Sequence, residues 1–407
     1  MATDWDKTDP IFKPIKSGIE TCLYPREFMP FLNDPPKLHR AIKSHMCSPL
    51  HDAFIAVIPA SSVETLLPRI TLNPKLSVSG SRGLLCSDDW FGELQKLTVT
   101  LRALPEEMGD IYRPTKMAVL DTGVRKRLAR FITKYKDFVS GCDDDYQDET
   151  GYGTDVIDLI QITYAPADIY VGRVFKRRKA TADTAALMTQ TIDMMARRPF
   201  TTQRLNGDVI VLPSGFQHDH PGIEAAIDEA RKAGILVFAA ASNYGNFSGI
   251  AFPACLYTEH KLFCMFSTDA NVKATPIYNL SVCSKAKESF PILGDDIRHP
   301  LAMAALSGTS FATAIGAAIA ARILDYSRQK NHSTRIRSVD KLTSVEGMSA
   351  VFSEMVKGAI DNGYHCMAPW RILPPWPDEE EEDNGEWRLQ ARAHIYEHME
   401  QRIWKGG

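Results

Sequence analysis

Apolar runs that read as strands alternate with helical patterns from about residue 116 to residue 241. The strand-like runs are short and rich in Val, Ile and Phe, and the segments between them space apolar residues as helices do. Strands are predicted at 117–121, 169–175, 208–212 and 235–241, and helices at 156–163, 181–196 and 221–234. This alternation predicts right-handed βαβ units, and therefore an α/β fold with a mostly parallel sheet flanked by helices.

In such a sheet, functional residues are expected where the strands end. Ligands of open parallel sheets bind beyond the carboxyl ends of the strands. Asp121 ends the run MAVLD, and Asn243 follows the run ILVFAAA. We therefore expect these two polar side chains at the same end of the sheet.

Bulk composition leaves the function open. The chain has 407 residues, 44% of them hydrophobic and 24% charged, which is ordinary for a globular protein with one large domain and smaller pieces. A net charge of -3 gives no reason to expect nucleic acid or an anionic membrane as a partner. The eight cysteines follow neither CxxC nor metal-ligand spacing, which favours free thiols and no metal site.

Two segments bear on location. Residues 1–16 mix charges with apolar residues and have no uninterrupted apolar core, so they do not form a secretory signal. We expect an intracellular, cytoplasmic protein. Residues 301–324 are long enough to span a membrane, but four hydroxyl side chains cluster within them, which favours a helix buried in a protein core.

Three segments carry the chemistry. They are Asp121-Thr-Gly at the end of an apolar strand, AAASNYG at 239–245, and SGTSFAT at 307–313 before an Ala-rich helical stretch. In this order they resemble the subtilisin-like serine peptidases (the subtilase family), with the aspartate first, an oxyanion asparagine next and the nucleophilic serine last. Asn243 and Ser310 follow Asp121 by 122 and 189 residues, which is close to the separations usual in that family.

The resemblance implies a fold and a reaction. It implies a subtilisin-like three-layer domain over residues 115–328 that hydrolyses peptide bonds through an acyl-enzyme on Ser310, without a cofactor. Asp121 would orient the general base, and Asn243 would donate to the oxyanion, a contribution worth about 10²–10³ in rate. The segment Pro213-Ser214-Gly215 resembles the family's strand that lines the substrate channel and pairs with a polypeptide backbone.

The sequence differs from the family pattern at the position of the general base. The family motif Gly-His-Gly-Thr corresponds to Gly151-Tyr152-Gly153-Thr154, in surroundings similar to those of subtilase domains from intracellular fungal proteins. A tyrosine has a pKa of about 10, so only about 0.1% is phenolate at pH 7, and a carboxylate neighbour raises that pKa further. Loss of the histidine costs on the order of 10⁶ in kcat in such an enzyme.

Two functions therefore remain open. The first is a serine endopeptidase impaired by Tyr152, acting on a polypeptide substrate. The second is a catalytically inactive pseudopeptidase that binds polypeptide or regulates a partner. The loop histidines His218, His220 and His299 offer no evident replacement base.

Other polar clusters are weak signals. Asp155 stands where a second histidine is common in the family. His394 and His398 share a predicted helix face without the HExxH pattern, and the run 143–145 matches no calcium loop, so no metal is expected.

The flanking regions carry no recognisable chemistry. Residues 1–110 form an N-terminal segment of unknown role, and residues 329–377 form a C-terminal extension. Residues 378–407 begin with the acidic spacer DEEEED and continue as an amphipathic helix at 386–404. We expect this helix to dock on its own domain rather than on a partner, and the sequence leaves the oligomeric state undetermined.

Overall fold

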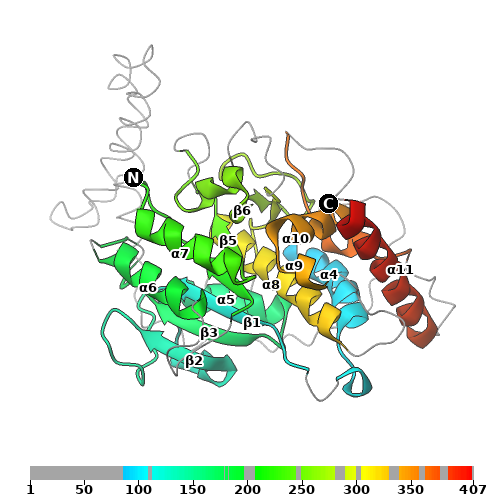
Figure 1. The fold of residues 1–407 in the computed structure, drawn as a ribbon, viewed down its shortest axis with the longest axis horizontal. Helices are drawn as coiled ribbons and strands as arrows, with labels where there is room; N and C mark the ends of the chain where they lie inside the picture. The colour runs from blue at the N-terminus through cyan, green and yellow to red at the C-terminus, as the bar shows by residue number, and fades with distance from the viewer. Residues whose placement is uncertain are drawn as a thin grey trace, which may run out of the picture. The chain divides into compact units, whose positions relative to one another are not determined.

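A six-stranded parallel sheet organises the described part of the chain (Figure 1). The computed structural model describes residues 86–108, 112–177, 179–181, 183–196, 207–243, 249–279, 289–298, 304–329, 339–356, 363–375 and 384–405. These residues belong to one compact unit.

The strands and helices alternate along the chain. The strands are β1 (Lys116–Asp121), β2 (Ile132–Asp137), β3 (Asp168–Arg173), β4 (Val209–Leu212), β5 (Leu236–Ala240) and β6 (Phe263–Met265), with a separate parallel pair of β7 (Ser267–Thr268) and β8 (Ile292–Leu293). The α-helices are α4 (Ser87–Leu101), α5 (Tyr152–Thr163), α6 (Thr184–Ala196), α7 (Pro221–Lys232), α8 (Thr309–Arg328), α9 (Val339–Leu342), α10 (Val345–Glu354) and α11 (Asn384–Lys405). Short 3₁₀ turns are η3 (Pro105–Glu107), η4 (Lys126–Phe131), η6 (Ala254–Glu259) and η7 (Pro369–Ile372).

The sheet lies between two helical layers. Its strand order is β2-β3-β1-β4-β5-β6, with α6 and α7 packed together on one face and α5 and α8 on the other (Figure 1). β4 and β5 are buried along their whole length, as strands covered on both faces must be. The predicted α/β fold with a mostly parallel sheet flanked by helices is confirmed.

The strand order places a crevice at the ends of β1 and β4. β1 pairs with β3 on one side and with β4 on the other, so the chain order reverses at β1. A reversal of this kind opens a crevice at the carboxyl ends of the strands. Asp121 ends β1, Pro213 follows β4, and Asn243 lies three residues beyond β5.

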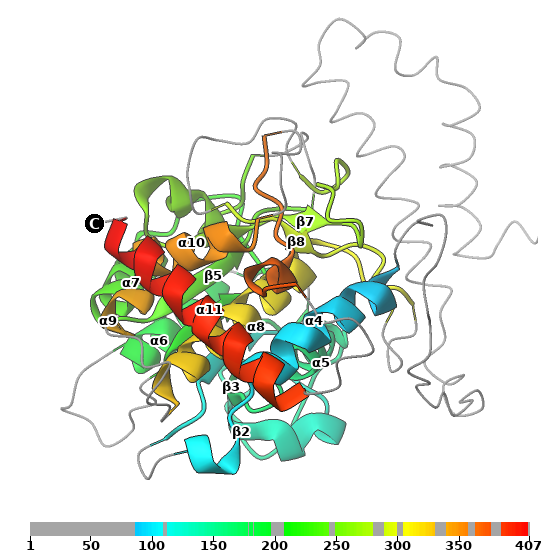
Figure 2. The same cartoon turned by 90° about the vertical axis from the view of Figure 1, so that its right-hand side faces the viewer.

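Helix α8 is enclosed on all sides. Every residue from Thr309 to Ser327 is buried, because the helix lies between the sheet and an outer layer that includes α4 and α9 (Figure 2). A helix enclosed in this way is apolar around its whole circumference, which explains its resemblance to a membrane span. In the described ranges, no helix is both long and apolar enough to cross a membrane. The prediction of a buried helix is confirmed for residues 309–324.

The C-terminal helix docks on this same unit, as expected. α11 packs against α10 and α4, and α4 itself lies within the predicted segment 1–110 (Figure 2). The buried Arg392 donates to the Thr100 carbonyl at 3.0 Å and to Gln329 at 2.8 Å, and Arg388 donates to Glu107 at 2.9 Å. Burial alone would raise the pKa of Glu107, but the Arg388 hydrogen bond and the other contacts outweigh it and lower that pKa below its usual value.

We predict that Arg392→Met lowers the free energy of unfolding by about 3 kcal/mol. The Glu107 carboxylate, 3.4 Å from Arg392, and the Gln329 amide would each lose a cationic partner. Arg402 provides the matched control on the same helix. Its side chain is 57% exposed and pairs with Glu354, so Arg402→Met should cost less than about 1 kcal/mol. Urea unfolding of both variants measures the difference. Equal losses would show that Arg392 does not anchor the helix.

Candidate active site

The end of β1 fixes the Asp121 side chain. Asp121 is buried, and its Oδ1 accepts a hydrogen bond from the Thr122 N–H at 2.8 Å. Its carbonyl accepts from the N–H groups of Val174 and Phe175, which follow β3, at 3.0 and 3.3 Å. The carboxylate therefore sits on a strand end that the neighbouring strand holds in place.

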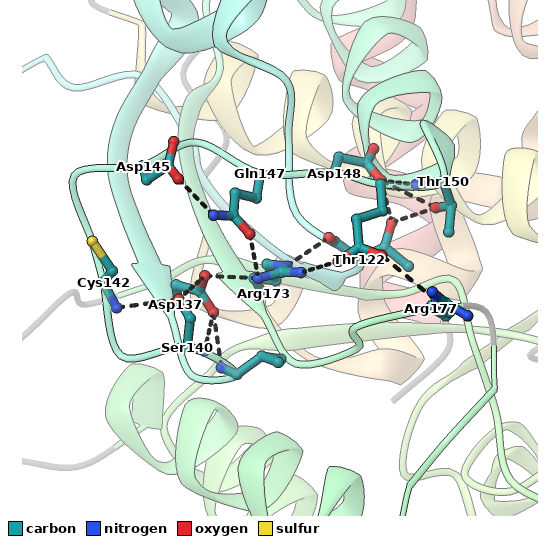
Figure 3. Close-up of polar contacts among 12 residues, drawn as sticks. Thr122, Asp137, Ser140, Cys142, Asp145, Gln147, Asp148, Thr150, Arg173 and Arg177 are labelled. Atoms are coloured by element: carbon teal, nitrogen blue, oxygen red, sulfur yellow. Dashed lines mark hydrogen bonds and ion pairs between the residues drawn. The ribbon is translucent and has the colours of Figure 1, made fainter. Parts of the chain in front are cut away.

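Thr122 and Asp148 hold the start of α5. The Asp148 carboxylate accepts from the Thr122 hydroxyl at 2.9 Å (Figure 3). It also accepts from the Thr154 N–H and hydroxyl at 2.8 and 2.6 Å. The Thr122 hydroxyl accepts from the Gly153 N–H at 3.0 Å. These bonds satisfy first-turn N–H groups that have no intrahelical acceptor, and the negative charge favours the helix N-terminus. Tyr152, the first residue of α5, is thereby positioned from the end of β1.

Two glycines allow this close approach. A Cβ on Gly153 would lie 2.2 Å from the Gly123 carbonyl oxygen. A Cβ on Gly123, whose φ is +108°, would lie 1.9 Å from the Gln147 carbonyl oxygen. The backbones of the two turns are therefore in direct contact, and a larger residue at either position would force them apart.

We predict that Gly153→Ala lowers the free energy of unfolding by about 3 kcal/mol, because an overpacked backbone contact cannot relax locally. Gly92→Ala serves as the control, since a Cβ there meets no atom within 4 Å and Gly92 lies inside an exposed turn of α4. That change should stabilise the protein by about 0.5–1 kcal/mol. Thermal unfolding of both variants distinguishes the effects, and a neutral Gly153→Ala would contradict the packing described here.

Ser310 lies at the second position of α8. Its side chain is buried, and its hydroxyl donates to the Pro213 carbonyl at 2.5 Å. The structure therefore joins Ser310 to the segment 213–215, which was expected to line the substrate channel. A carbonyl oxygen accepts a hydrogen bond but does not take up the proton, so in this arrangement the hydroxyl is not activated as a nucleophile.

The far end of that segment is also held. A Cβ on the exposed Gly215 would lie 2.9 Å from the Phe252 carbonyl oxygen, and Phe216 exchanges backbone hydrogen bonds of 2.7 and 3.0 Å with Phe252. Ser214, between them, is half-buried. The segment is thus anchored at both ends, directly after the carboxyl end of β4.

Asn243 caps α8 beside Ser310. Its Oδ1 accepts from the Thr309 N–H at 2.7 Å and from the Thr309 hydroxyl at 3.0 Å. Because the oxygen faces these donors, the amide nitrogen is the group left to donate elsewhere. That nitrogen lies against Gly308, where a Cβ would meet it at 2.9 Å. A fixed amide donor beside the first-turn N–H groups of a helix suits the stabilisation of an oxyanion.

Tyr152 packs against the residue that follows Ser310. Its ring centroid lies 5.1 Å from that of Phe311, with the planes tilted by 44°. Its N–H donates to the Thr150 hydroxyl at 3.2 Å. Ser310 thus contacts Pro213 directly, while Asn243 binds the preceding residue, Thr309, and Tyr152 packs against the following residue, Phe311. Asp121 connects to this group through Thr122 and the start of α5.

The histidines have other neighbours. His220 begins α7, and its ring lies edge-on to Phe216 at 4.6 Å, while His218 is exposed. The rings of His394 and His398 on α11 lie 4.0 Å apart, and burial lowers the pKa of His394. His299 lies outside the described residues.

Several acidic side chains of the described ranges form ion pairs and caps. No group of three His, Cys, Asp or Glu side chains that could hold a metal ion occurs in the described ranges. In the acidic run 143–145, Asp143 pairs with Lys136 at 2.8 Å and accepts from the Asp137 N–H at 3.0 Å. This run is therefore tied to the end of β2 as a loop.

Asp155 is the titratable group of the first turn of α5. Burial, together with the nearby carboxylates Asp158 and Asp148, raises the pKa of Asp155 to about 6, although Arg125 and Arg127 partly offset these effects. The folded state therefore favours the neutral form of Asp155 more than the unfolded chain does. Its contribution to stability is complete below the unfolded pKa of about 4 and is lost as the pH rises through 6.

We predict that Asp155→Asn becomes progressively more stable than the natural chain between pH 4 and pH 7, by about 1–2 kcal/mol at the upper end. The amide keeps the shape of the neutral carboxyl group and cannot ionise. Urea unfolding of both proteins across this pH range gives the difference at each pH. A difference that does not change with pH would show that Asp155 ionises in the folded protein as it does in the unfolded chain.

Sequence reasoning missed the residues that position the site. Thr122 and Phe311 stood only as members of motifs, and Asp148 was not singled out. Asp148 did leave a signal, because an aspartate shortly before a helix start is a frequent capping residue. The contact between Tyr152 and Phe311 has no signal in the sequence, because it depends on how α5 packs against α8.

Comparison with known proteins adds a likeness of fold. No protein-family model matches the chain, and no curated protein matches it. Among solved structures, it is similar to the prenylagaramide maturation protease PagA, with 16% sequence identity, a TM-score of 0.46, and coverage of 76% of this chain and 98% of that one. Likeness at this level assigns no chemistry, so the function is inferred from the side chains of this chain.

Proposed function

We propose that this protein carries a subtilisin-like serine endopeptidase site whose activity is impaired because Tyr152 replaces the general-base histidine. The single observation that supports this most is the meeting of Asn243, Pro213 and Ser310 at the start of α8. Three segments far apart in sequence supply, at one place, a hydroxyl nucleophile, an amide donor and a backbone that can pair with a peptide.

Each group has a part in peptide hydrolysis. The Ser310 oxygen attacks the peptide carbonyl carbon, and the developing oxyanion accepts hydrogen bonds from the Asn243 amide and from the N–H of Ser310 in the first turn of α8. Segment 213–215 pairs with the peptide backbone and aligns the scissile bond. The leaving amine departs with a proton, and water then hydrolyses the acyl-enzyme on Ser310.

The step impaired by Tyr152 is the transfer of the Ser310 hydroxyl proton to a base. A histidine at position 152 would accept it and pass it to the leaving amine, with Asp121 holding the ring. Tyr152 has an aromatic ring packed on Phe311 instead, and a phenol is almost entirely protonated at neutral pH. Residual catalysis then comes from binding and from the oxyanion donors, and turnover is slow.

One observation favours a second function. The Ser310 hydroxyl donates to a backbone carbonyl and not to a base that could take up its proton, which fits a chain that does not cut peptides. On this alternative, the chain is a pseudopeptidase that binds polypeptide in the crevice and acts as a binding or regulatory module.

We predict that Tyr152→His raises the rate of peptide hydrolysis at least about 10²-fold over the natural chain, because it supplies a base that titrates near neutral pH. Hydrolysis of casein and of a fluorogenic peptide by both proteins measures the gain. Ser310→Ala, made in each background, is the blank.

The outcomes separate the two functions. Hydrolysis by Tyr152→His that disappears with Ser310→Ala supports the peptidase site. A natural chain that already cleaves at an ordinary enzymatic rate would contradict the impairment by Tyr152. Absence of cleavage in both proteins, together with retention of casein by the natural chain, would favour the pseudopeptidase.

A further inference from the structure

Arg173 is a buried cation surrounded by oxygen atoms. It is only 1% exposed and ends β3. Its Nε donates to the Thr122 carbonyl at 3.2 Å, and one terminal nitrogen donates to Asp137 at 2.8 Å and to Gln147 at 3.1 Å (Figure 3). The other terminal nitrogen lies 3.6 Å from the Glu149 carboxylate. A guanidinium is costly to bury unless its donors are matched in this way.

The four oxygen partners come from three segments. Thr122 follows β1, Asp137 ends β2, and Gln147 and Glu149 lie in the loop that leads into α5. The Gln147 carbonyl also accepts from the Val124 N–H at 3.0 Å, which ties that loop to the β1 turn a second time. The Arg173 side chain therefore connects the turn after β1 to the loop that leads into α5.

Asp137 is fully engaged in this arrangement. Its carboxylate accepts from the Ser140 hydroxyl at 2.6 Å and from the Val139 and Ser140 N–H groups at 2.8 and 2.9 Å, in addition to Arg173. Burial alone would raise the pKa of Asp137, but the hydrogen bonds from Ser140 and Arg173 outweigh it and lower that pKa. The Asp137 carboxylate that accepts from Arg173 is thus held in one position and is ionised.

The contacts lead from Arg173 to the candidate active site in two steps. Arg173 holds the carbonyl of Thr122, and the Thr122 hydroxyl holds the Gly153 N–H and the Asp148 carboxylate. Those two groups determine where α5 starts. The first residue of that helix is Tyr152, whose ring lies against Phe311.

We infer that Arg173 is a positioning residue of the site: it fixes the Asp121–Thr122 turn against the loop at 137–149 and so places residue 152 relative to Ser310. In other loops lined by carboxylate and carbonyl oxygens, a bound calcium ion has this organising role. In this chain, a covalently attached guanidinium has it. The effect of Arg173 on catalysis rests on the proposed function. The effect of Arg173 on the position of α5 does not.

Arg322 provides a control for ordinary structural loss. It is also a buried arginine that donates to two backbone carbonyls, those of Thr98 and Thr163, but it lies in the C-terminal half of α8. Replacing either arginine removes a buried cation. Only the replacement of Arg173 should loosen the start of α5.

The first test is hydrogen exchange, measured by mass spectrometry on the full chain under conditions in which each variant is folded. Arg173→Met should speed exchange in residues 147–156 at least about 10-fold, and Arg322→Met should leave this segment within about 2-fold of the natural chain. Arg173→Lys keeps the charge but not the fork of donors, and it should give an intermediate effect. If Arg173→Met does not fold, the comparison of Arg173→Lys with Arg322→Lys decides the question.

The second test is kinetic and uses the Tyr152→His background. Arg173→Lys should lower kcat about 10-fold or more and leave KM within about 2-fold, because segment 213–215 is held separately from α5. Arg322→Lys should leave both constants within about 2-fold. A rise in KM equal to the fall in kcat would overturn the positioning role.

The two tests fail in different ways. If Tyr152→His does not hydrolyse peptides, the proposed function is wrong, and hydrogen exchange still decides the role of Arg173. If exchange in residues 147–156 rises equally in the Arg173 and Arg322 variants, or in neither, Arg173 is not a positioning residue, whatever the hydrolysis result.

Discussion

The enclosure of α8 is the constraint on which the rest of the structure depends. With every residue from Thr309 to Ser327 buried, the helix can neither tilt nor slide without disturbing the sheet on one side and α4 on the other. Its N-terminus therefore presents Ser310 at a fixed place. The same enclosure explains why polar groups near its C-terminal half, such as Arg322 and Gln329, are matched by carbonyls and by arginines of other elements.

The site is assembled from two halves with different supports. Ser310, Asn243 and Pro213 form one half and are held by the first turn of α8. Asp121 and Tyr152 form the other half, and backbone contacts and buried charges around the β1 turn hold them. The first half holds the proposed nucleophile and the proposed oxyanion donor. The second half is held by its own contacts, and its Tyr152 ring packs against Phe311 of α8.

Much of the fold could be predicted from the sequence because its central strands are buried on both faces. The apolar runs of β1, β4 and β5 and the β-rich run of β3 predicted these four strands. β2 was missed because Lys134 and Lys136 interrupt its pattern, as befits a strand at the edge of the sheet. The candidate nucleophile and oxyanion donor came from motifs, but the bond from Ser310 to Pro213 spans 97 residues and depends on packing that no local pattern encodes.

The docking of α11 has a consequence for synthesis. Arg388 pairs with Glu107 across 281 residues of chain. At roughly 5–20 residues per second, the ribosome needs about 15–55 s to make the intervening polypeptide. During that interval α4, the sheet and α8 can leave the ribosome and begin to pack, although Arg388, which pairs with Glu107, has not yet been synthesised. The Glu107 carboxylate can therefore be paired only after α11 has been synthesised. A nascent chain stalled before residue 388 would lack this contact.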